Sequence, residues 1–424
     1  DASWPHTCHD ACMSTRKHAS PEIPSPNASD LRGLGRLAID GVTGVTDLVE
    51  AMHAAITHLP SAIGRPAPAS TTGLTGFVYQ SVRTITGWVG DGIDASFTGL
   101  APFLGDGERG PQREATLAAM NGVLGDHLEA SQNPLAISMR LRVDGHALEL
   151  DRNSLAARFP DASNKLLLLV HGLCMDDLQW NYAGHDHGEA LASELGYTAL
   201  YLHYNSGRHI STNGRDFSSL LDQLAKAWPV PLEEITVLGH SMGGLVTRSA
   251  IEDGFSKRRV WSKVPIRTVF MGTPHHGAPL ERAGSWADML IGISPYSAPF
   301  VRLGQVRSAG IQDLRHGNLR DADWQDLDGN GLADGRTPLP LPRKVTAYAI
   351  AVSTQAKRKD EDESRARGDG LVPIDSALGI HPDSAFDLRI PKARQWVGYG
   401  INHLELLGSD VVYQQLERWL RKPL

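Results

Sequence analysis

A serine set between glycines is the residue of this sequence that is best placed to do chemistry. The segment Gly239-His240-Ser241-Met242-Gly243 follows an apolar stretch, Ile235–Leu238, and precedes a helical pattern that begins at Leu245. Glycines on both sides of the serine let the chain turn so sharply that the hydroxyl stands clear of a sheet edge. Strand, sharp turn and helix together are typical of a nucleophile elbow, so we predict that Ser241 is the nucleophile of a serine hydrolase.

Such a serine needs a histidine that accepts its proton and a carboxylate that orients the histidine. In this kind of fold the three follow one another in the order serine, acid, histidine. His403 lies near the chain end, directly after a predicted strand and before a helix, whereas His381 precedes Pro382 in a predicted surface turn. We therefore predict His403 as the general base.

The acid is expected on the loop after the strand that ends near Val352. Asp360 and Asp362 belong to a mixed-charge run of the kind that faces water. Asp369 stands between two glycines and leads into apolar residues, a setting that can bury and orient a carboxylate. We predict Asp369 as the acid, with Asp375 as its substitute.

Attack on an ester carbonyl places negative charge on oxygen, which must be met by backbone N–H donors. Met242 N–H follows the nucleophile, and Leu173 N–H lies on the loop after an apolar strand, so we predict both as oxyanion donors. His171 on that loop is expected to make structural hydrogen bonds or to contact substrate. Asn205 and His209 follow the next strand and are candidate substrate contacts.

Strand and helix patterns alternate from residue 134 to the end of the chain, which predicts an open, mostly parallel α/β sheet with helices on both faces. A β-hairpin with its turn at Asp144-Gly145 opens this region. The irregular interval 278–343 follows the sixth strand and is predicted to be a cap or lid insertion, although a surface insertion without a gating role stays open.

The first third of the chain has a different pattern. Residues 1–30 are rich in Pro, Ser, His and Ala, which indicates a disordered leader. Residues 31–133 contain three amphipathic helical patterns, over 42–59, 78–97 and 117–128, and form a predicted accessory helical region. These helices are expected to pack on each other and on the hydrolase domain, with contact to a lipid or polymer surface as the alternative.

Composition narrows the class of partner. The chain has 424 residues, 41% hydrophobic and 21% charged, with a net charge of -7. A negative chain is a poor binder of nucleic acid, and no apolar run reaches the length of about 18 residues that spans a bilayer. With three cysteines there is no disulfide framework, and we expect a cytoplasmic location, with secretion as the alternative.

Five sequence blocks in this order resemble the bacterial lipases and esterases of the α/β-hydrolase superfamily, including the inositol-deacylase-like branch. The resemblance covers about three-fifths of the chain, from Asn164 to the end. The five blocks are Val170-His171-Gly172-Leu173, Gly239-His240-Ser241-Met242-Gly243-Gly244, Met271-Gly272-Thr273-Pro274-His275-His276-Gly277, Gly368-Asp369-Gly370-Leu371-Val372-Pro373 and Asn402-His403-Leu404. The resemblance implies the α/β-hydrolase fold and assigns the same nucleophile, acid, base and oxyanion donors.

The reaction so predicted is carboxylic-ester hydrolysis through an acyl-enzyme, which requires no cofactor. Lipid, small ester and polyester substrates all fit it, as does acyl transfer, and an inactive hydrolase scaffold that binds a lipid or polyester surface is the alternative from another class. The lipase relatives bind calcium near the histidine through an aspartate, where this chain has Glu405. A second candidate calcium loop carries Asp326, Asp328, Asn330 and Asp334 but lacks the closing glutamate.

Overall fold

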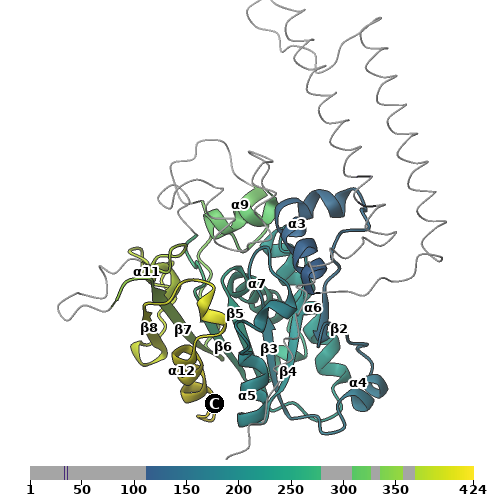
Figure 1. Cartoon of the computed structure of the whole chain (residues 1–424). Coiled ribbons are helices and arrows are strands. Elements are labelled where there is room, and N and C mark those ends of the chain that lie inside the picture. Colours follow the sequence, from purple (N-terminus) through teal and green to yellow (C-terminus); the bar gives the residue numbers. More distant parts are fainter. Residues whose placement is uncertain (1–32, 34–35, 37–110, 278–307, 326–334, 357–367) are drawn as a thin grey trace, which may run out of the picture.

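The structure is a computed structural model that describes residues 33, 36, 111–277, 308–325, 335–356 and 368–424 (Figure 1). Within these residues one sheet of eight strands has the order β2-β1-β4-β3-β5-β6-β7-β8. The strands are β1 Arg140–Val143, β2 His146–Ala147, β3 Lys165–Val170, β4 Thr198–His203, β5 Glu234–His240, β6 Ile266–Met271, β7 Val345–Ser353 and β8 Gln395–Tyr399. The longer helices are α3 Pro111–Ala130, α5 His187–Leu195, α6 Ile210–Ala227, α7 Met242–Ser256, α9 Ala309–His316 and α12 Asp410–Leu420.

The predicted α/β-hydrolase fold is confirmed. Strands β3 to β8 pair in parallel, and only the β1–β2 hairpin and its pairing with β4 are antiparallel. The hairpin turns at Asp144 and Gly145 as expected, and both residues have the positive φ that such a turn requires. A parallel sheet must be covered on both faces, because its strands have no side turned toward water.

The apolar run of β3 shows how the two faces are covered. Leu166, Leu168 and Val170 pack in the core beneath α6 and α7, whereas Leu167 and Leu169 pack in the core beneath α5 and α12. Successive side chains of a strand point to opposite faces, so a continuous run of buried leucines packs against the helices on both faces of the sheet. The centre of the sheet is thereby fixed by its own sequence.

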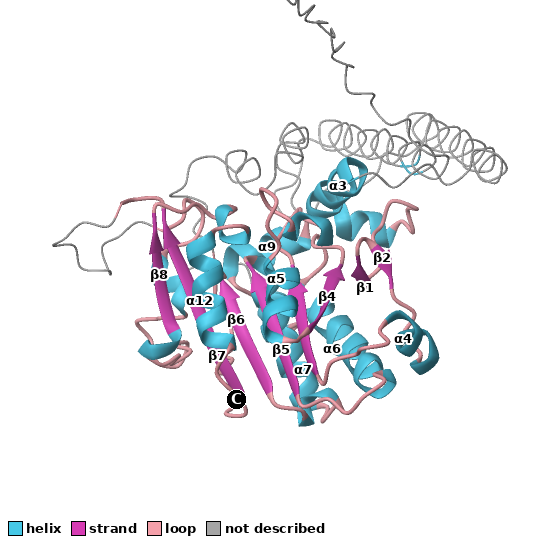
Figure 2. Cartoon of the chain, turned by 60° about the horizontal axis from the view of Figure 1, so that its bottom comes forward, coloured by secondary structure: helices cyan, strands magenta, loops and turns pink. Residues whose placement is uncertain are grey.

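Helix α3 lies with α9 beyond the ends to which the strand arrows point (Figure 2). It falls within the predicted accessory region, and its pattern over 117–128 is helical as expected. Ala119 and Val123 of α3 belong to the same core cluster as the leucines of β3. This helix therefore shares a core with the α/β fold.

The contact of α3 with the carboxyl edge of the sheet is close. A Cβ on Gly122 would lie 2.3 Å from Cys174 Sγ and 2.9 Å from Cys174 N, so only glycine fits there. The Gly122 carbonyl accepts a hydrogen bond from Ser308 Oγ (2.6 Å), and Asn205 Nδ2 donates to Gly125 O (2.9 Å). These contacts hold α3 against the loops after β3 and β4 and against the start of α9.

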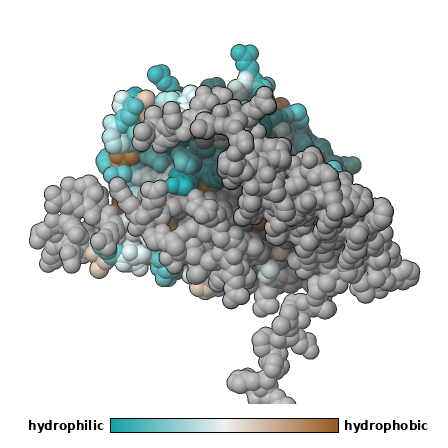
Figure 3. Space-filling model, turned by 90° about the horizontal axis from the view of Figure 1, so that it is seen from above, coloured by the Kyte–Doolittle hydropathy of each residue, from teal (hydrophilic) through white to brown (hydrophobic). Residues whose placement is uncertain are grey.

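The described surface is mainly polar. Seen from above, its visible part is mostly hydrophilic, with small separate hydrophobic areas (Figure 3). Among the described residues the exposed large hydrophobic side chains are Val260, Val411 and Leu424. None of the described helices is both long and apolar enough to cross a bilayer. The two earlier helical patterns, over 42–59 and 78–97, lie outside the described residues, as do the predicted leader and most of the predicted lid (278–307 and 326–334).

Replacing Gly122 with alanine tests the packing of α3. Alanine for glycine normally stabilises a helix by about 0.5–1 kcal/mol. Here the added Cβ meets the Cys174 backbone, so we expect Gly122→Ala to lower the free energy of unfolding by about 1–3 kcal/mol in urea titrations. Adding Cys174→Ala removes the Sγ contact and should restore part of the loss. A single variant more stable than the wild type would contradict the packing.

Candidate active site

Ser241 occupies a strained turn between β5 and α7. Its backbone angles are φ 53° and ψ -126°, a combination that residues other than glycine rarely adopt. The Ser241 N–H donates to the Met271 carbonyl at the end of the neighbouring strand β6 (2.9 Å), which fixes the turn to the sheet edge. The serine side chain is thus held above the carboxyl ends of the central strands.

The glycines of the motif are required by close backbone approach. A Cβ on Gly243 would lie 2.2 Å from the Val170 carbonyl oxygen, and one on Gly239 would lie 2.7 Å from Gly244 Cα. A Cβ on Gly244 would lie 2.0 Å from Thr273 Oγ1. Each glycine lets neighbouring atoms pack closely against the turn. This packing holds Ser241 in its strained backbone conformation.

Asp369 is buried and oriented by its own loop. Its Oδ1 accepts hydrogen bonds from the N–H groups of Leu371 (2.9 Å) and Val372 (2.7 Å). A Cβ on Gly368 would lie 1.7 Å from the Val372 carbonyl oxygen, and Gly370 has φ +100°, so the flanking glycines allow this tight loop. Asp375, the substitute acid, is exposed at the start of the short helix α11 (Ile374–Leu378).

His403 bonds to Asp369 and packs beside the serine turn. His403 Nδ1 and Asp369 Oδ2 are 2.6 Å apart, and both side chains are buried. The ring of His403 lies 4.8 Å from the ring of His240, the residue before Ser241. Gly272 packs against the pair, because a Cβ there would lie 3.2 Å from His403 Cε1 and 3.3 Å from Asp369 Oδ2.

This arrangement determines what the histidine can do. A carboxylate only accepts hydrogen bonds, so His403 Nδ1 carries the hydrogen and Nε2 keeps a free lone pair. His240 Nε2 lies 3.1 Å from the His403 carbonyl oxygen and therefore donates to it. Burial, followed by the charge of His403, holds the pKa of His240 well below its usual range. Neutral His240 thus fixes the His403 backbone without competing for a proton.

Two backbone N–H groups near the serine turn donate no backbone hydrogen bond to an acceptor among the described residues. They belong to Leu173 on the loop after β3 and to Met242 at the first turn of α7. The loop is pinned by Cys174 N–H, which donates to Ser206 Oγ (3.0 Å). A Cβ on Gly172 would lie 3.1 Å from Ser241 Cβ, so this loop runs directly beside the serine. Donors in this position can stabilise a developing oxyanion.

Comparison with protein families agrees with this geometry. Residues 162–333 match the family model described as the PGAP1-like alpha/beta domain. The match includes Ser241 and both N–H donors, while Asp369 and His403 lie beyond its end. No sequence among the curated proteins matches the chain significantly.

Among solved structures, the chain is similar to lipases and esterases at low identity. The mature lipase BlEst2 of Bacillus licheniformis is 16% identical, with 67% of this chain and 98% of that chain covered and a TM-score of 0.40. Its propeptide form is 16% identical, with 68% and 54% covered and the same TM-score. An esterase of Pyrococcus furiosus is 14% identical, with 61% and 80% covered and a TM-score of 0.35.

The three predicted substrate contacts make internal contacts in the structure. The ring of buried His171 stacks on Tyr204 (4.3 Å), and burial lowers its pKa to about 3. Buried Asn205 accepts from Gly207 N–H (3.1 Å) besides bonding to α3. His209 Nδ1 lies 3.0 Å from Asp313 Oδ2, and its ring stacks on Trp324 at 3.6 Å. Each of these side chains ties a loop of the carboxyl edge to a neighbouring element.

No metal cluster of three or more His, Cys, Asp or Glu residues occurs in the described part of the chain. Glu405, at the place of the relatives' calcium ligand, accepts a hydrogen bond from Asn402 N–H (2.8 Å), and Asn402 Oδ1 accepts one from Glu405 N–H (3.0 Å). This reciprocal pair braces the His403 loop. The other candidate calcium ligands, Asp326, Asp328, Asn330 and Asp334, lie outside the described residues. Burial raises the pKa of the Cys174 thiol to about 12, so this cysteine stays a neutral thiol.

A buried charge network near the loop after β3 has no counterpart in the sequence motifs. Arg142 of β1 bonds to Asp177 (3.1 Å) and to Glu114 of α3 (2.8 Å), and His203 Nδ1 lies 2.8 Å from Asp177 Oδ1. These residues come from four separate segments, and no local pattern marks them as neighbours. The network links α3 to the 3₁₀ turn Asp177–Trp180, which follows the loop that carries Leu173.

Asp176 at the start of this turn gives a pH-dependent prediction. Its Oδ1 accepts from the N–H groups of Leu178 and Gln179, while its Oδ2 is buried without a partner. Burial, followed by the charge of Asp177, raises the pKa of Asp176 to about 7. Because the folded-state pKa lies above the unfolded value, stability is highest below about pH 4 and is lost as the pH rises through 7.

Asp176→Asn keeps an amide oxygen that can cap the turn and removes the ionisation. We expect the variant to match the wild type near pH 4 and to gain stability over it between pH 4 and 8, on the order of 4 kcal/mol at full ionisation. Urea titrations at several pH values measure this difference. A stability difference that stays constant with pH would show that Asp176 ionises in the folded protein as it does in water.

Proposed function

We propose that the protein is a serine carboxylic-ester hydrolase in which Ser241, His403 and Asp369 form the catalytic triad. The observation that carries the proposal is the buried 2.6 Å hydrogen bond between His403 and Asp369, beside the strained turn that presents Ser241. The PGAP1-like alpha/beta domain supports a hydrolase of the lipase and esterase type. The triad would join Ser241 to two residues that lie more than 100 positions later in the chain.

The reaction follows from the properties of these groups. His403 Nε2 removes the proton of Ser241 as Oγ forms a bond to the ester carbonyl carbon. The carbonyl oxygen becomes an oxyanion, which accepts hydrogen bonds from the Leu173 and Met242 N–H groups. The C–O bond to the alcohol then breaks, and His403 returns the proton to the leaving oxygen. Water, deprotonated by His403, attacks the acyl-enzyme and releases the carboxylic acid.

The strain at Ser241 and the loop of Asp369 serve this reaction in different ways. The positive φ of Ser241 keeps its hydroxyl off the helix, where it would otherwise cap an N–H group of α7. The N–H groups that bond Asp369 Oδ1 leave Oδ2 for His403, which holds the ring in one tautomer. Lipid, small ester and polyester substrates are all compatible with these steps, and the proposal covers this shared ester chemistry.

Labelling with a fluorophosphonate tests the nucleophile. We expect covalent capture of the wild type, with the adduct located on Ser241 by mass spectrometry of the digested protein, and no capture in Ser241→Ala. Hydrolysis of p-nitrophenyl esters of increasing chain length, measured in parallel, gives the preferred acyl length. Folded wild-type protein that neither reacts with the probe nor cleaves any ester would instead favour the inactive scaffold that binds a surface.

Replacing the acid tests its role in orienting His403. Asp369→Asn presents an amide that no longer fixes the tautomer of the histidine, so we expect kcat for the best p-nitrophenyl ester to fall about 10⁴-fold with little change in folding. Asp375→Asn is the matched control, since it makes the same change at an exposed position six residues later. Equal losses in the two variants, or a loss confined to Asp375→Asn, would reject the assignment of the acid.

A further inference from the structure

A buried arginine on the elbow helix lies outside the proposed machinery and lacks a counter-charge. Arg248 is 5% exposed and forms no ion pair with any carboxylate of the described residues. Its short hydrogen bond is to the Leu339 carbonyl (2.8 Å), and its contacts with His275 Nδ1 and the His275 carbonyl are long, at 3.4 and 3.5 Å. Its Nε–H is buried without a partner. A guanidinium removed from water costs free energy unless it is paired.

The acidic residue beside Arg248 is already satisfied by other donors. Asp323 Oδ2 accepts hydrogen bonds from the N–H groups of Leu319 (2.8 Å) and Arg320 (3.0 Å), and its Oδ1 accepts one from Thr337 (3.1 Å). These bonds use Asp323 to organise the turn before the short helix α10 (Ala322–Gln325). Asp323 therefore lowers the local positive potential without directly bonding the guanidinium.

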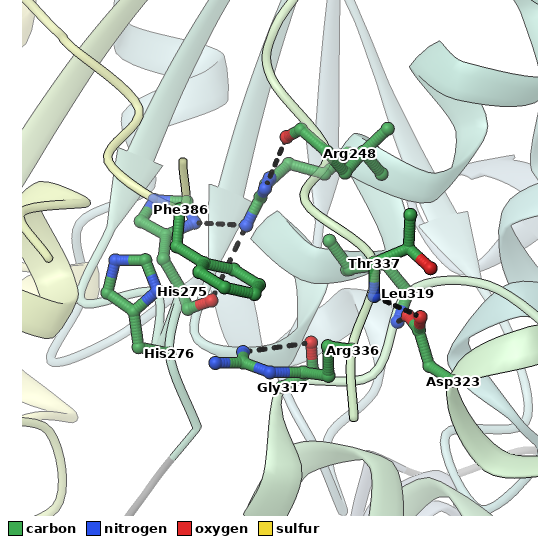
Figure 4. A pocket seen from close by; sticks show the side chains of 10 residues that line it. Arg248, His275, His276, Gly317, Leu319, Asp323, Arg336, Thr337 and Phe386 are labelled. Carbon is green, nitrogen blue, oxygen red and sulfur yellow. Dashed lines mark hydrogen bonds between the residues drawn. The ribbon is translucent and has the colours of Figure 1, made fainter. Parts of the chain in front are cut away.

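Arg248 lines a small pocket whose other walls carry further nitrogen groups. Arg248 and Arg336 approach it from opposite sides, His275 and His276 form a third wall, and the Phe386 ring lies across the front (Figure 4). His276 Nε2 is buried and unpartnered. The cavity volume is about 10 Å³, which is enough for one water molecule or one ion of similar size.

The contact with Arg248 fixes the tautomer of His275. Its Nδ1 faces a guanidinium, which only donates, so Nδ1 is an acceptor and the ring hydrogen lies on Nε2. That Nε2 is also buried without a partner. Burial, followed by the charge of Arg248, holds the pKa of His275 well below its usual range, and burial, followed by the charge of Arg336, lowers the pKa of Arg248 to about 9. The surroundings therefore resist any further positive charge.

We propose that this pocket binds a single small inorganic anion, the size of chloride, against the Arg248 guanidinium. A water molecule would accept one hydrogen bond but leave the buried positive charge uncompensated. A halide would accept the hydrogen bond and also compensate the charge. The anion would sit between α7, the segment after β6 and the segment that contains Leu339. It would thus join the helix behind Ser241 to the base of the region predicted as a cap.

Halide binding is tested on the full chain by two independent measurements. Crystals grown with bromide in place of chloride should show an anomalous difference peak within hydrogen-bonding distance of Arg248. In solution, replacing gluconate with chloride at constant ionic strength should raise Tm in a saturable manner, by about 2 °C at a tenfold excess over Kd. The proposal does not depend on catalysis, so loss of esterase activity has no bearing on it.

Variants assign the solution effect to the pocket. Arg248→Met should abolish the chloride dependence of Tm, while Arg259→Met should keep it, because Arg259 is paired with Asp253 near the end of the same helix. If Arg248→Met does not fold, the bromide experiment on the wild type still decides. An ordered pocket with no anomalous peak, or a chloride dependence that is unchanged in folded Arg248→Met, would overturn the proposal.

Discussion

The structure depends on one backbone constraint, the positive φ of Ser241. A non-glycine residue in this conformation costs about 1–3 kcal/mol, and it persists only where the surroundings over-determine it. Here the surroundings are the hydrogen bond from Ser241 N–H to Met271 and the close packing around Gly243 and Gly244. Both strands β3 and β6 must be in register with β5 for these contacts to form. The parallel sheet is therefore the device that holds the serine turn under strain.

The carboxyl edge of the sheet is rich in buried polar groups, and most of them hold loops in place by hydrogen bonding. His171, His240 and His275 are all fully or nearly fully buried, and burial lowers the pKa of each. Neutral imidazoles can brace loops through directed hydrogen bonds without adding charge near the base. His403 differs from these three because its ring is hydrogen-bonded to a buried carboxylate, that of Asp369.

Much of this arrangement was predictable, because it rests on local patterns. The apolar strand expected before Leu173 is β3, and the glycines around Ser241 predicted the sharp turn that the structure shows. The start of α6 at Ile210 depends on a contact that sequence patterns do not show, because Asp313, about 100 residues later, bonds His209 and Ile210 N–H.

Contacts between segments that are distant in the chain could not be predicted from local sequence patterns. The short helices α9 and α11 were not predicted, since each has only one or two turns and is stabilised by what it packs against. The sequence predicted that α3 packs on the hydrolase domain, but it did not indicate that Gly122 would contact the loop that carries Leu173. A helical glycine facing a partner looks the same in sequence as one facing water, so the pattern could give the helix but not its neighbour.

Helix α7 links the two sites inferred from this structure. Ser241 precedes its first turn, and Arg248 lies two turns further along, about 10 Å along the helix axis. The N-terminal end of a helix favours negative charge, which suits an oxyanion at Met242 N–H. A positive charge left unpaired within the same helix would also favour that oxyanion, but at the expense of folding. A bound anion at Arg248 would relieve that cost and weaken the long-range attraction, so the two sites would be coupled electrostatically through one helix.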